Sequence, residues 1–331
     1  MLISRTLSSL NTPLPLDIGQ GTAITIGNFD GVHMGHHALL SLTRKRAAET
    51  GTLPVAITFD PHPMEVLTPN APPRLTSCQS RMAMLEAAGM DLVIKIEFTK
   101  EVAGMDPEAF VRVLLDRLNM KELLLGYDFT LGKGRTGTPE VLKGIGLREG
   151  FAVEQLAAFN IHDCTVSSTR IRNLLLEGNV REAGIMLGRL HYLQGEIIHG
   201  QNRGGRLLGY PTANLAPSEI MLPKPGVYAT LATPFPGQPS PLPKTVQYPQ
   251  TGTWPAVTNV GYNPTFGPGA LTIETHLLDF SGNIYGQQLE VAFVERLRGE
   301  VTFSGPDALV AQINKDAEKA RNILAKFHMG K

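Results

Sequence analysis

Two histidines, His33 and His36, follow a glycine-rich stretch that begins at Gly27. The stretch joins an apolar, β-suited run at residues 23–29 to an amphipathic run at residues 38–48. On the first turn of a helix, histidines three residues apart share a face beside unpaired backbone N–H groups and the positive end of the helix dipole. Two imidazoles there could donate hydrogen bonds to the charge that builds on a phosphate under attack. The spacing therefore indicates phosphate-transfer chemistry.

The two histidines have alternative interpretations, namely two other catalytic motifs and a turn without a ligand. A zinc protease places two histidines four residues apart around a glutamate, and a Walker motif ends in Gly-Lys-Ser/Thr; neither pattern occurs here. A strand-to-helix turn that binds nothing would also fit His-x-Gly-His alone. The partner motifs elsewhere in the chain decide between these readings.

The first half of the chain alternates apolar runs with helical patterns, which predicts a parallel sheet with helices on both faces. In such a sheet, ligands bind beyond the carboxyl ends of the strands. The expected strands are 23–29, 54–59, 92–98, 122–128 and 152–159, and the expected helices are 35–49, 79–88 and 106–119.

Polar motifs follow two of these expected strands. Asp60 and His62 lie in a Phe-Asp-Pro-His-Pro run, where the prolines stop the strand, although an ordinary proline turn explains the same residues. Residues 126–137 hold four glycines together with Lys133 and Arg135. That composition suits contact with a phosphorylated ligand, and a flexible surface loop is the alternative.

A further cluster lies at residues 166–175. Ser167, Ser168 and Thr169 are strong helix N-cap residues, so a helix should start here. Arg170 and Arg172 follow immediately, and cations at this position oppose the helix dipole unless an anion is bound. This local misfit favours an anion-binding role over a plain cap.

The second half changes to strands and turns, with no clear helix until about residue 306. This pattern predicts a small antiparallel barrel closed by a C-terminal helix with an apolar stripe. The domain boundary is placed near residue 186, giving domains 1–186 and 187–331. The expected strands are 192–198, 227–232, 257–260, 271–280 and 288–296, with a hairpin tip at 281–283.

Residues 203–214 carry the chemical signal of this half. Gly205 and Arg206 belong to a run of glycines and arginines that would surround an oligophosphate. Thr212 and Asn214 offer two neutral oxygens, the hard ligands that Mg²⁺ shares with phosphate and water. As a bare pattern, Pro-Thr-Ala-Asn could equally be a turn.

Glu274 is an acid within an expected strand, where burial without a partner would be costly. A carboxylate near a substrate hydroxyl could accept its proton as the oxygen attacks a γ-phosphate. A salt-bridged or solvent-facing glutamate is the alternative.

Together these motifs resemble one family. The run Gly-x-Phe-Asp-Gly-x-His-x-Gly-His at residues 27–36 is similar to the signature of prokaryotic bifunctional riboflavin kinase/FMN adenylyltransferases, the FAD synthetases. Six motifs occur in the family's order over nearly the whole chain. The resemblance implies an α/β parallel-sheet, Rossmann-like HxGH nucleotidyltransferase domain followed by a small antiparallel β-barrel riboflavin kinase domain with a C-terminal helix.

The resemblance also implies two reactions and the residues that serve them. The barrel would phosphorylate riboflavin with ATP and Mg²⁺ to give FMN, with Glu274 as the base and Thr212 and Asn214 at the metal. The first domain would transfer AMP from ATP to FMN, giving FAD and pyrophosphate, with His33 and His36 stabilising the α-phosphate. The implied ATP and phosphate contacts are Gly27, Phe29, Gly31, His33, His36, Ser167, Ser168, Thr169, Arg172, Gly205 and Arg206, and the implied flavin contacts are Asp60, His62, Asp128 and Phe129.

The chain departs from the family pattern at two places. Leu131 stands where the glycine-rich loop of the family usually has a second phenylalanine. Residues 233–255 hold seven prolines where the family has a short connection, and such a segment should be an extended surface loop rather than a central strand. A tolerated insertion explains it best.

Composition limits the partners. Lys plus Arg number 30 and Asp plus Glu also number 30, which argues against a nucleic-acid coat or a membrane-surface protein. The two cysteines lack metal-ligand spacing, and no run of about 20 apolar residues is present, so a cytoplasmic protein with small-molecule ligands is expected.

Three rival functions are considered. The first is another HxGH transferase, such as a pantetheine-phosphate adenylyltransferase or a cytidylyltransferase, and the Pro-Thr-Ala-Asn motif of a second domain argues against it. The second is a flavin carrier that has lost catalysis, which should show damaged motifs. The third is a protein with only one working domain.

Overall fold

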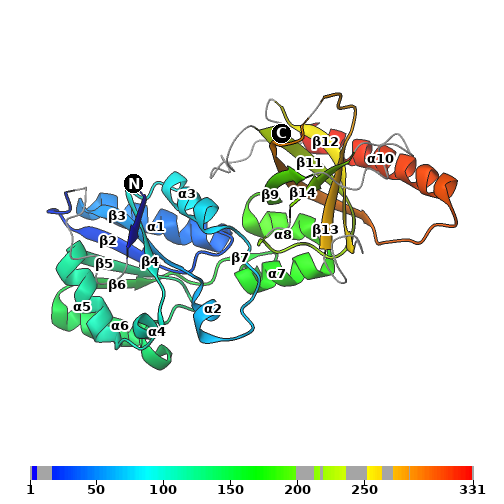
Figure 1. Ribbon diagram of the computed structural model, residues 1–331. Coiled ribbons are helices and arrows are strands. Elements are labelled where there is room, and N and C mark those ends of the chain that lie inside the picture. Colours follow the sequence, from blue (N-terminus) through cyan, green and yellow to red (C-terminus); the bar gives the residue numbers. More distant parts are fainter. Residues whose placement is uncertain are drawn as a thin grey trace. The chain divides into compact units, whose positions relative to one another are not determined.

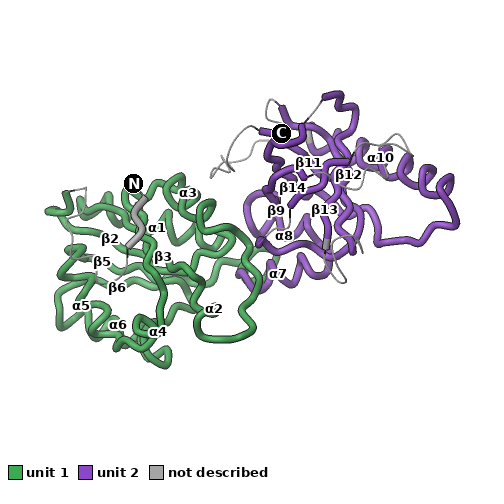
Figure 2. Tube along the Cα trace, viewed as in Figure 1, with its two compact units in different colours: residues 1–167 green, residues 168–331 purple. Residues whose placement is uncertain are grey.

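The computed structural model describes residues 2–5, 17–198, 212–216, 219–235, 252–262, 271–282 and 284–329. The chain forms two compact units, residues 1–167 and 168–331, which Figure 2 colours separately. Each unit is described by itself below.

The first unit contains one parallel sheet of six strands in the order β1-β4-β3-β2-β5-β6. The chain runs from β2 through β3 to β4 on one side, then continues with β5 and β6 on the other side of β2. The bounds are β1 (Leu2–Arg5), β2 (Thr22–Ile26), β3 (Leu53–Asp60), β4 (Leu92–Glu97), β5 (Met120–Leu125) and β6 (Ala152–Gln155).

Helices cover both faces of this sheet (Figure 1). Ala23 and Ala56 pack with α1 and α3 on one face, whereas Ile24 and Ile57 pack with α5 and α6 on the other. The side chains of neighbouring strand residues thus point to opposite cores, which explains the near-continuous apolar strands. The bounds are α1 (Met34–Thr50), α2 (Pro63–Leu67), α3 (Cys78–Ala87), α4 (Lys100–Ala103), α5 (Pro107–Leu118) and α6 (Pro139–Glu149).

The predicted α/β fold of this half is confirmed, since all five expected strands and all three expected helices are present. The strand order reverses between β2 and β5. In open α/β sheets, a ligand crevice forms at such a reversal, beyond the carboxyl ends of the strands. The turn that carries the histidines follows β2 at this point.

The second unit contains a closed antiparallel barrel in the order β10-β13-β12-β11-β14-β9, as predicted for this half. Among the described residues of this unit, two helices precede the barrel and one follows it. The bounds are α7 (Ser168–Glu177), α8 (Val180–Leu187), β9 (His191–Ile198), β10 (Ala213–Leu215), β11 (Gly226–Phe235), β12 (Trp254–Tyr262), β13 (Leu271–Leu277), β14 (Gln288–Arg298) and α10 (Pro306–Met329).

The two faces of the barrel wall differ in chemistry. Val227, Ala229 and Leu231 of β11 pack with Ala320 and Leu324 of α10, so these strand residues face outward. The intervening residues face the interior. There Thr258 hydrogen-bonds both Thr230 (2.8 Å) and Thr275 (3.0 Å), and all three are fully buried.

An ion pair and a hydrogen bond connect helix α10 to the end of β14. Arg298 donates to both carboxylate oxygens of Asp316, with its Nη2 at 2.8 Å from Oδ2, and Lys319 donates to the carbonyl of Leu297. Asp316 is 5% exposed, so the pair is largely shielded from water. These contacts fix the C-terminal helix against the barrel.

The domain boundary near residue 186 stays a prediction. The compact units divide between residues 167 and 168, so α7 and α8, which precede the barrel, belong to the second unit.

The expected loop at residues 233–255 begins later and ends earlier than predicted. Strand β11 continues through Pro234 to Phe235, and Pro255 lies within β12. Pro234 pairs with Leu289 of β14, and Pro255 pairs with Leu231 of β11 while its carbonyl accepts from the Leu278 N–H, so both prolines lie near the ends of paired strands. Residues 236–251, and residue 283 of the expected hairpin tip, lie outside the described residues.

Candidate functional site

The turn between β2 and α1 has an unusual backbone. Phe29 (φ 49°), Gly31 (φ 84°) and Val32 (φ 37°) all occupy the left-handed region. A β-branched valine there is strained, and such strain persists only where surrounding contacts impose it. One of those contacts is a hydrogen bond from the Val32 N–H to the Phe29 carbonyl, 3.0 Å long.

His33 and His36 together cap α1. The Nδ1 of His33 accepts from the backbone N–H of His36, and the Nδ1 of His36 accepts from the backbone N–H of His33, each at 3.3 Å. The rings stack with their centroids 3.6 Å apart and an interplanar angle of 13°. Because both Nδ1 atoms act as acceptors, each neutral ring carries its hydrogen on Nε2. The predicted pair is thus brought together as two Nε2–H donors at a helix N-terminus.

Two glycines and an aromatic ring pack closely around the pair. The ring of Phe29 lies edge-on to that of His36, with centroids 5.2 Å apart. A Cβ on Gly35 would come within 3.3 Å of the His33 ring, and one on Gly27 within 3.2 Å of the Phe29 ring. Both glycines are therefore needed for close approach to aromatic rings.

Asp30, which was not among the predicted site residues, stabilises the turn between β2 and α1. Its carboxylate is 2% exposed and accepts from the backbone N–H groups of Leu75 and Thr76. The Thr76 hydroxyl in turn accepts from the Gly31 N–H at 3.1 Å. Asp30 lies within the glycine-rich motif, but its partners are 45 and 46 residues away, so only the fold reveals its role.

The turn after β3 places Asp60 among three cations. Arg74 Nη1 lies 3.1 Å from Asp60, while Arg81 and Lys95 each lie 3.7 Å from it. His62, which is 8% exposed, caps α2 by accepting from the Met64 N–H through Nδ1. The two predicted flavin residues therefore lie at the carboxyl edge of the sheet, after the strand adjacent to β2.

Arg74 also contacts α2. Its Nε and Nη2 donate to the two carboxylate oxygens of Glu65, both at 2.6 Å. This fork holds the pKa of Glu65 below its ordinary range. Arg74 was not identified from the sequence, because nothing local to it indicates two acidic partners.

The loop after β5 is anchored by apolar side chains. Phe129 and Leu131 both pack against the core cluster on the α5 and α6 face, and Leu131 exchanges backbone hydrogen bonds with Gly137. Leu131 thus supplies apolar packing at the position of the missing aromatic ring. Asp128 remains exposed, and partial burial raises the pKa of the neighbouring Tyr127.

Helix α7 begins at Ser168, as the capping residues predicted. Ser167 and Ser168 are half-buried, Thr169 is exposed and Arg172 is half-buried. The division between the compact units falls between Ser167 and Ser168. The expectation that this group holds phosphates opposite the histidines stays a prediction.

In the barrel, three polar residues form one row across three strands. Glu274 of β13 pairs directly with Asn214 of β10 on one side and with Asn259 of β12 on the other. Directly paired residues point to the same face, and Asn259 in turn pairs with the outward-facing Val227. Glu274 is therefore an outer-face residue flanked by two carboxamides. Asn259 was not among the predicted site residues.

The residues around this row are partly buried and closely packed. Asn214 is 8% exposed, and Thr212 is half-buried just before β10. A Cβ on Gly261 would lie 2.5 Å from a carboxylate oxygen of Glu300 and 3.1 Å from Nδ2 of Asn259. Gly205 and Arg206 lie outside the described residues.

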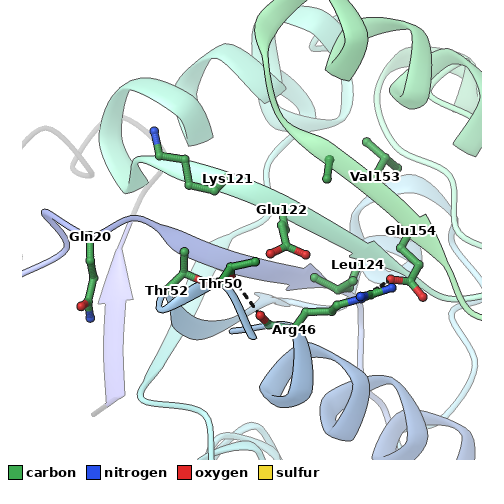
Figure 3. A pocket seen from close by; sticks show the side chains of 10 residues that line it. Gln20, Arg46, Thr50, Thr52, Lys121, Glu122, Leu124, Val153 and Glu154 are labelled. Carbon is green, nitrogen blue, oxygen red and sulfur yellow. Dashed lines mark hydrogen bonds and ion pairs between the residues drawn. The ribbon is translucent and has the colours of Figure 1, made fainter. Parts of the chain in front are cut away.

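A cavity of about 680 Å³ in the first unit lies away from all of these residues (Figure 3). It opens at the amino ends of β5 and β6, opposite the carboxyl edge of the sheet. Arg46 spans it and donates to Glu154 at 2.6 Å. Its lining residues are Gln20, Arg46, Thr50, Thr52, Lys121, Glu122, Leu124, Ala152, Val153 and Glu154, none of which is a predicted site residue.

Among the described helices, none has both the length and the apolar character needed to cross a membrane. The same residues contain no group of three or more His, Cys, Asp or Glu side chains arranged to hold a metal ion. The candidate metal residues Thr212 and Asn214 are neutral oxygen donors, which such a grouping does not include.

Comparisons with known proteins assign both halves. A model of the FAD synthetase family matches residues 17–170, and a model of the riboflavin kinase family matches residues 187–324. One solved structure, described as a macrolide-efflux protein from Streptococcus pneumoniae, is 28% identical and covers 97% of this chain and 99% of its own, with a TM-score of 0.81.

Curated relatives extend over both domains. Bifunctional riboflavin kinase/FMN adenylyltransferase of Pseudomonas fluorescens is 36% identical over 308 residues, covering 92% of this chain and 94% of the relative. The enzymes of the same name from Haemophilus influenzae and Escherichia coli K12 are 36% and 32% identical, each over 304 residues, covering 91% of this chain and 94% and 92% of those enzymes. The chain therefore belongs to the bifunctional riboflavin kinase/FMN adenylyltransferase family.

Proposed function

We propose that this chain catalyses both reactions for which its relatives are named, phosphorylating riboflavin to FMN in the barrel and adenylylating FMN to FAD in the α/β unit. The observation that carries the proposal is that each domain presents a separate reactive group: a histidine cap where the strand order of the sheet reverses, and a carboxylate between two carboxamides on the barrel. ATP, riboflavin, FMN and FAD are the ligands.

In adenylyl transfer, a phosphate oxygen of FMN attacks the α-phosphorus of ATP, and the bond to the leaving pyrophosphate breaks. The Nε2–H groups of His33 and His36 donate to the α-phosphate oxygens, where negative charge builds. Ser167, Ser168, Thr169 and Arg172 hold the outer phosphates. The FMN phosphate is already anionic near neutral pH, so positioning and electrostatics are sufficient without a general base.

In the kinase reaction, the primary hydroxyl of riboflavin attacks the γ-phosphorus of ATP, and ADP leaves. Glu274 accepts the hydroxyl proton as the new P–O bond forms. Gly205 and Arg206 contact the nucleotide phosphates. Glu274 suits this role because its strand places it on the outer face of the barrel, directly paired with Asn214 and Asn259 on the two neighbouring strands.

The donor set beside Glu274 fits Mg²⁺. Thr212 and Asn214 supply neutral oxygens next to a carboxylate, and Mg²⁺ prefers such hard ligands while it keeps several waters and substrate oxygens. When bound, Mg²⁺ would neutralise charge on the ATP phosphates. Asn214 is held by strands on both sides, so its carboxamide is placed by the sheet rather than by a loop.

Flavin contacts in the first unit are assigned to Asp60, His62, Asp128 and Phe129, which all follow the carboxyl ends of β3 and β5. A cytoplasmic setting is supported by two free thiols, Cys78 and Cys164. Equal numbers of acidic and basic residues support small-molecule ligands rather than nucleic acid or a membrane surface.

The test is a time course of purified protein with riboflavin, ATP and Mg²⁺, in which the flavins are separated by chromatography, repeated with FMN as the sole flavin. FMN should appear first, and FAD should follow. Accumulation of FMN without FAD would contradict the assignment of the first unit, whereas FAD formed only from supplied FMN would contradict that of the barrel.

A further inference from the structure

Residues 74–81, here called the bridging segment, contact the two polar turns at the carboxyl edge of the first unit's sheet. At the histidine turn, the Leu75 and Thr76 N–H groups donate to Asp30 at 3.0 to 3.2 Å. At the turn after β3, Arg74 contacts Asp60 at 3.1 Å. One short segment thus joins the two turns by hydrogen bonds and ion pairs.

A second anchor of this segment is buried. Arg81 is 1% exposed, and its Nη2 donates to the Phe59 carbonyl at 2.8 Å while lying 3.7 Å from Asp60. A buried guanidinium is costly unless it is paired, so this contact fixes the segment against the last residues of β3. The bridging segment is therefore held at both of its ends.

Arg74 joins three elements. Its guanidinium contacts Asp60 through Nη1 and grips both carboxylate oxygens of Glu65 on α2 through Nε and Nη2. A planar fork that satisfies two carboxylates has little rotational freedom, and a lysine could not reproduce it. Loss of Arg74 would remove the link between α2 and Asp60 and leave Asp60 only its longer contacts to Arg81 and Lys95, whereas the Asp30 contacts to the segment's backbone would remain.

We propose that Arg74 is a positioning residue for adenylyl transfer, which holds the 60–63 turn in the place where it receives the flavin of FMN. The inference rests on the proposed function, in which the histidine turn serves ATP and the 60–63 turn serves FMN. Because displacements of about 1 Å matter in such reactions, a residue outside the reacting groups can control the rate through alignment. Arg74 touches the flavin-side turn directly and the ATP-side turn only through the backbone of its neighbours.

The experiment compares Arg74→Met with the unchanged chain in FAD formation from FMN and ATP. We expect the KM for FMN to rise about tenfold while the KM for ATP stays within twofold, because the Asp30 anchor of the histidine turn remains. Riboflavin kinase activity of the same protein should be unchanged. Arg74→Lys, which can keep one ion pair but not the fork, should give an intermediate KM for FMN.

Two further variants sharpen the result. Arg112→Met removes an exposed arginine that pairs with Glu149 at 2.8 Å elsewhere in the same unit, and it should leave both KM values unchanged. Glu65→Gln weakens the fork but leaves the Arg74–Asp60 contact, so the KM for FMN should rise two- to fourfold.

An unchanged KM for FMN in Arg74→Met would overturn the proposal, as would an equal rise in the KM for ATP. Should Arg74→Met not fold, an unchanged KM for FMN in Glu65→Gln would be equally decisive against it. Absence of FAD formation in the unsubstituted chain is a separate outcome, which would instead refute the proposed function.

Discussion

The two units place reactive side chains in different ways. In the α/β unit, His33 and His36 stand on an irregular turn whose backbone enters the left-handed region at three residues. In the barrel, Glu274, Asn214 and Asn259 are ordinary strand residues brought together by register alone. The first site depends on local contacts that maintain a strained turn, whereas the second depends on correct strand pairing.

This difference predicts how each site fails. The histidine turn can be disturbed by one added methyl group or by loss of the Asp30 carboxylate, while β2 stays paired with its neighbouring strands. A strand row resists such changes, but a one-residue shift in register would carry Glu274 to the barrel interior. The predictions below test this contrast.

The largest effect should come from removing the reactive groups themselves. His36→Ala should lower FAD formation at least hundredfold, because a donor to the α-phosphate is lost, and leave FMN formation intact. Glu274→Ala should lower FMN formation by a similar factor and leave FAD formation from supplied FMN intact. Initial rates for both reactions provide the measurement. Loss of both products from either folded variant would remove the distinction between two separate sites.

A smaller effect should follow from crowding the histidine turn. Gly35→Ala adds a Cβ that would lie 3.3 Å from the His33 ring, so the imidazole must shift, and FAD formation should fall about tenfold. Gly144→Ala in α6 is the matched control, since its Cβ would meet nothing closer than 4.0 Å. That control should keep full activity. Equal activity of the two variants would show that the turn tolerates displacement.

The support beneath the turn should matter mainly for stability. Asp30→Asn replaces one carboxylate oxygen by a donor that faces the Leu75 and Thr76 N–H groups. We expect the free energy of unfolding of the first unit to fall by about 1 to 3 kcal/mol, the usual cost of an unsatisfied buried group. Denaturant titration followed by a probe in that unit measures this. A barrel that unfolds at its original midpoint would localise the effect.

The smallest effect concerns pH. Arg74 lowers the pKa of Glu65 from its ordinary value of 4.5, so the ion pair contributes stability above that value and loses it as the pH falls through the depressed pKa. Glu65→Gln should therefore destabilise the protein at pH 7 by less than about 1 kcal/mol, as expected for a partly exposed pair. As the pH falls below 4.5 and through the depressed pKa of Glu65, the difference between the two proteins should shrink. A difference that stays constant throughout an acid titration would mean that packing, not charge, makes the contribution.

The sequence predicted those features that depend on local patterns. Apolar runs gave the main strands, and glycine spacing gave the histidine turn, because both are encoded within a few residues. The capping serines correctly placed the start of α7.

Features that depend on distant partners were not predictable. Asn259 lies beside Glu274 only because β12 and β13 pair in one particular register. Asp30 accepts a hydrogen bond from Thr76, which lies 46 residues away in the sequence. Strand β1 pairs with β4 at the sheet edge without any pattern of its own that marks it as a strand. The proline-rich segment was misjudged at its ends because Pro234 and Pro255 lie at the ends of β11 and β12, where a missing donor interrupts little of the pairing.

The reciprocal histidine cap has a consequence for engineering this enzyme. Active-site residues usually cost stability, so replacing them often yields a hardier but inactive protein. Here the Nδ1 atoms that place the ring hydrogens on the two Nε2 atoms also accept from the backbone N–H groups of His36, in the first turn of α1, and of the N-cap residue His33. Substituting either histidine removes a helix cap, which typically costs about 1 kcal/mol. Folding and the proposed catalytic role thus depend on the same two side chains, and a search for stabilising mutations should retain both residues even when no activity is screened.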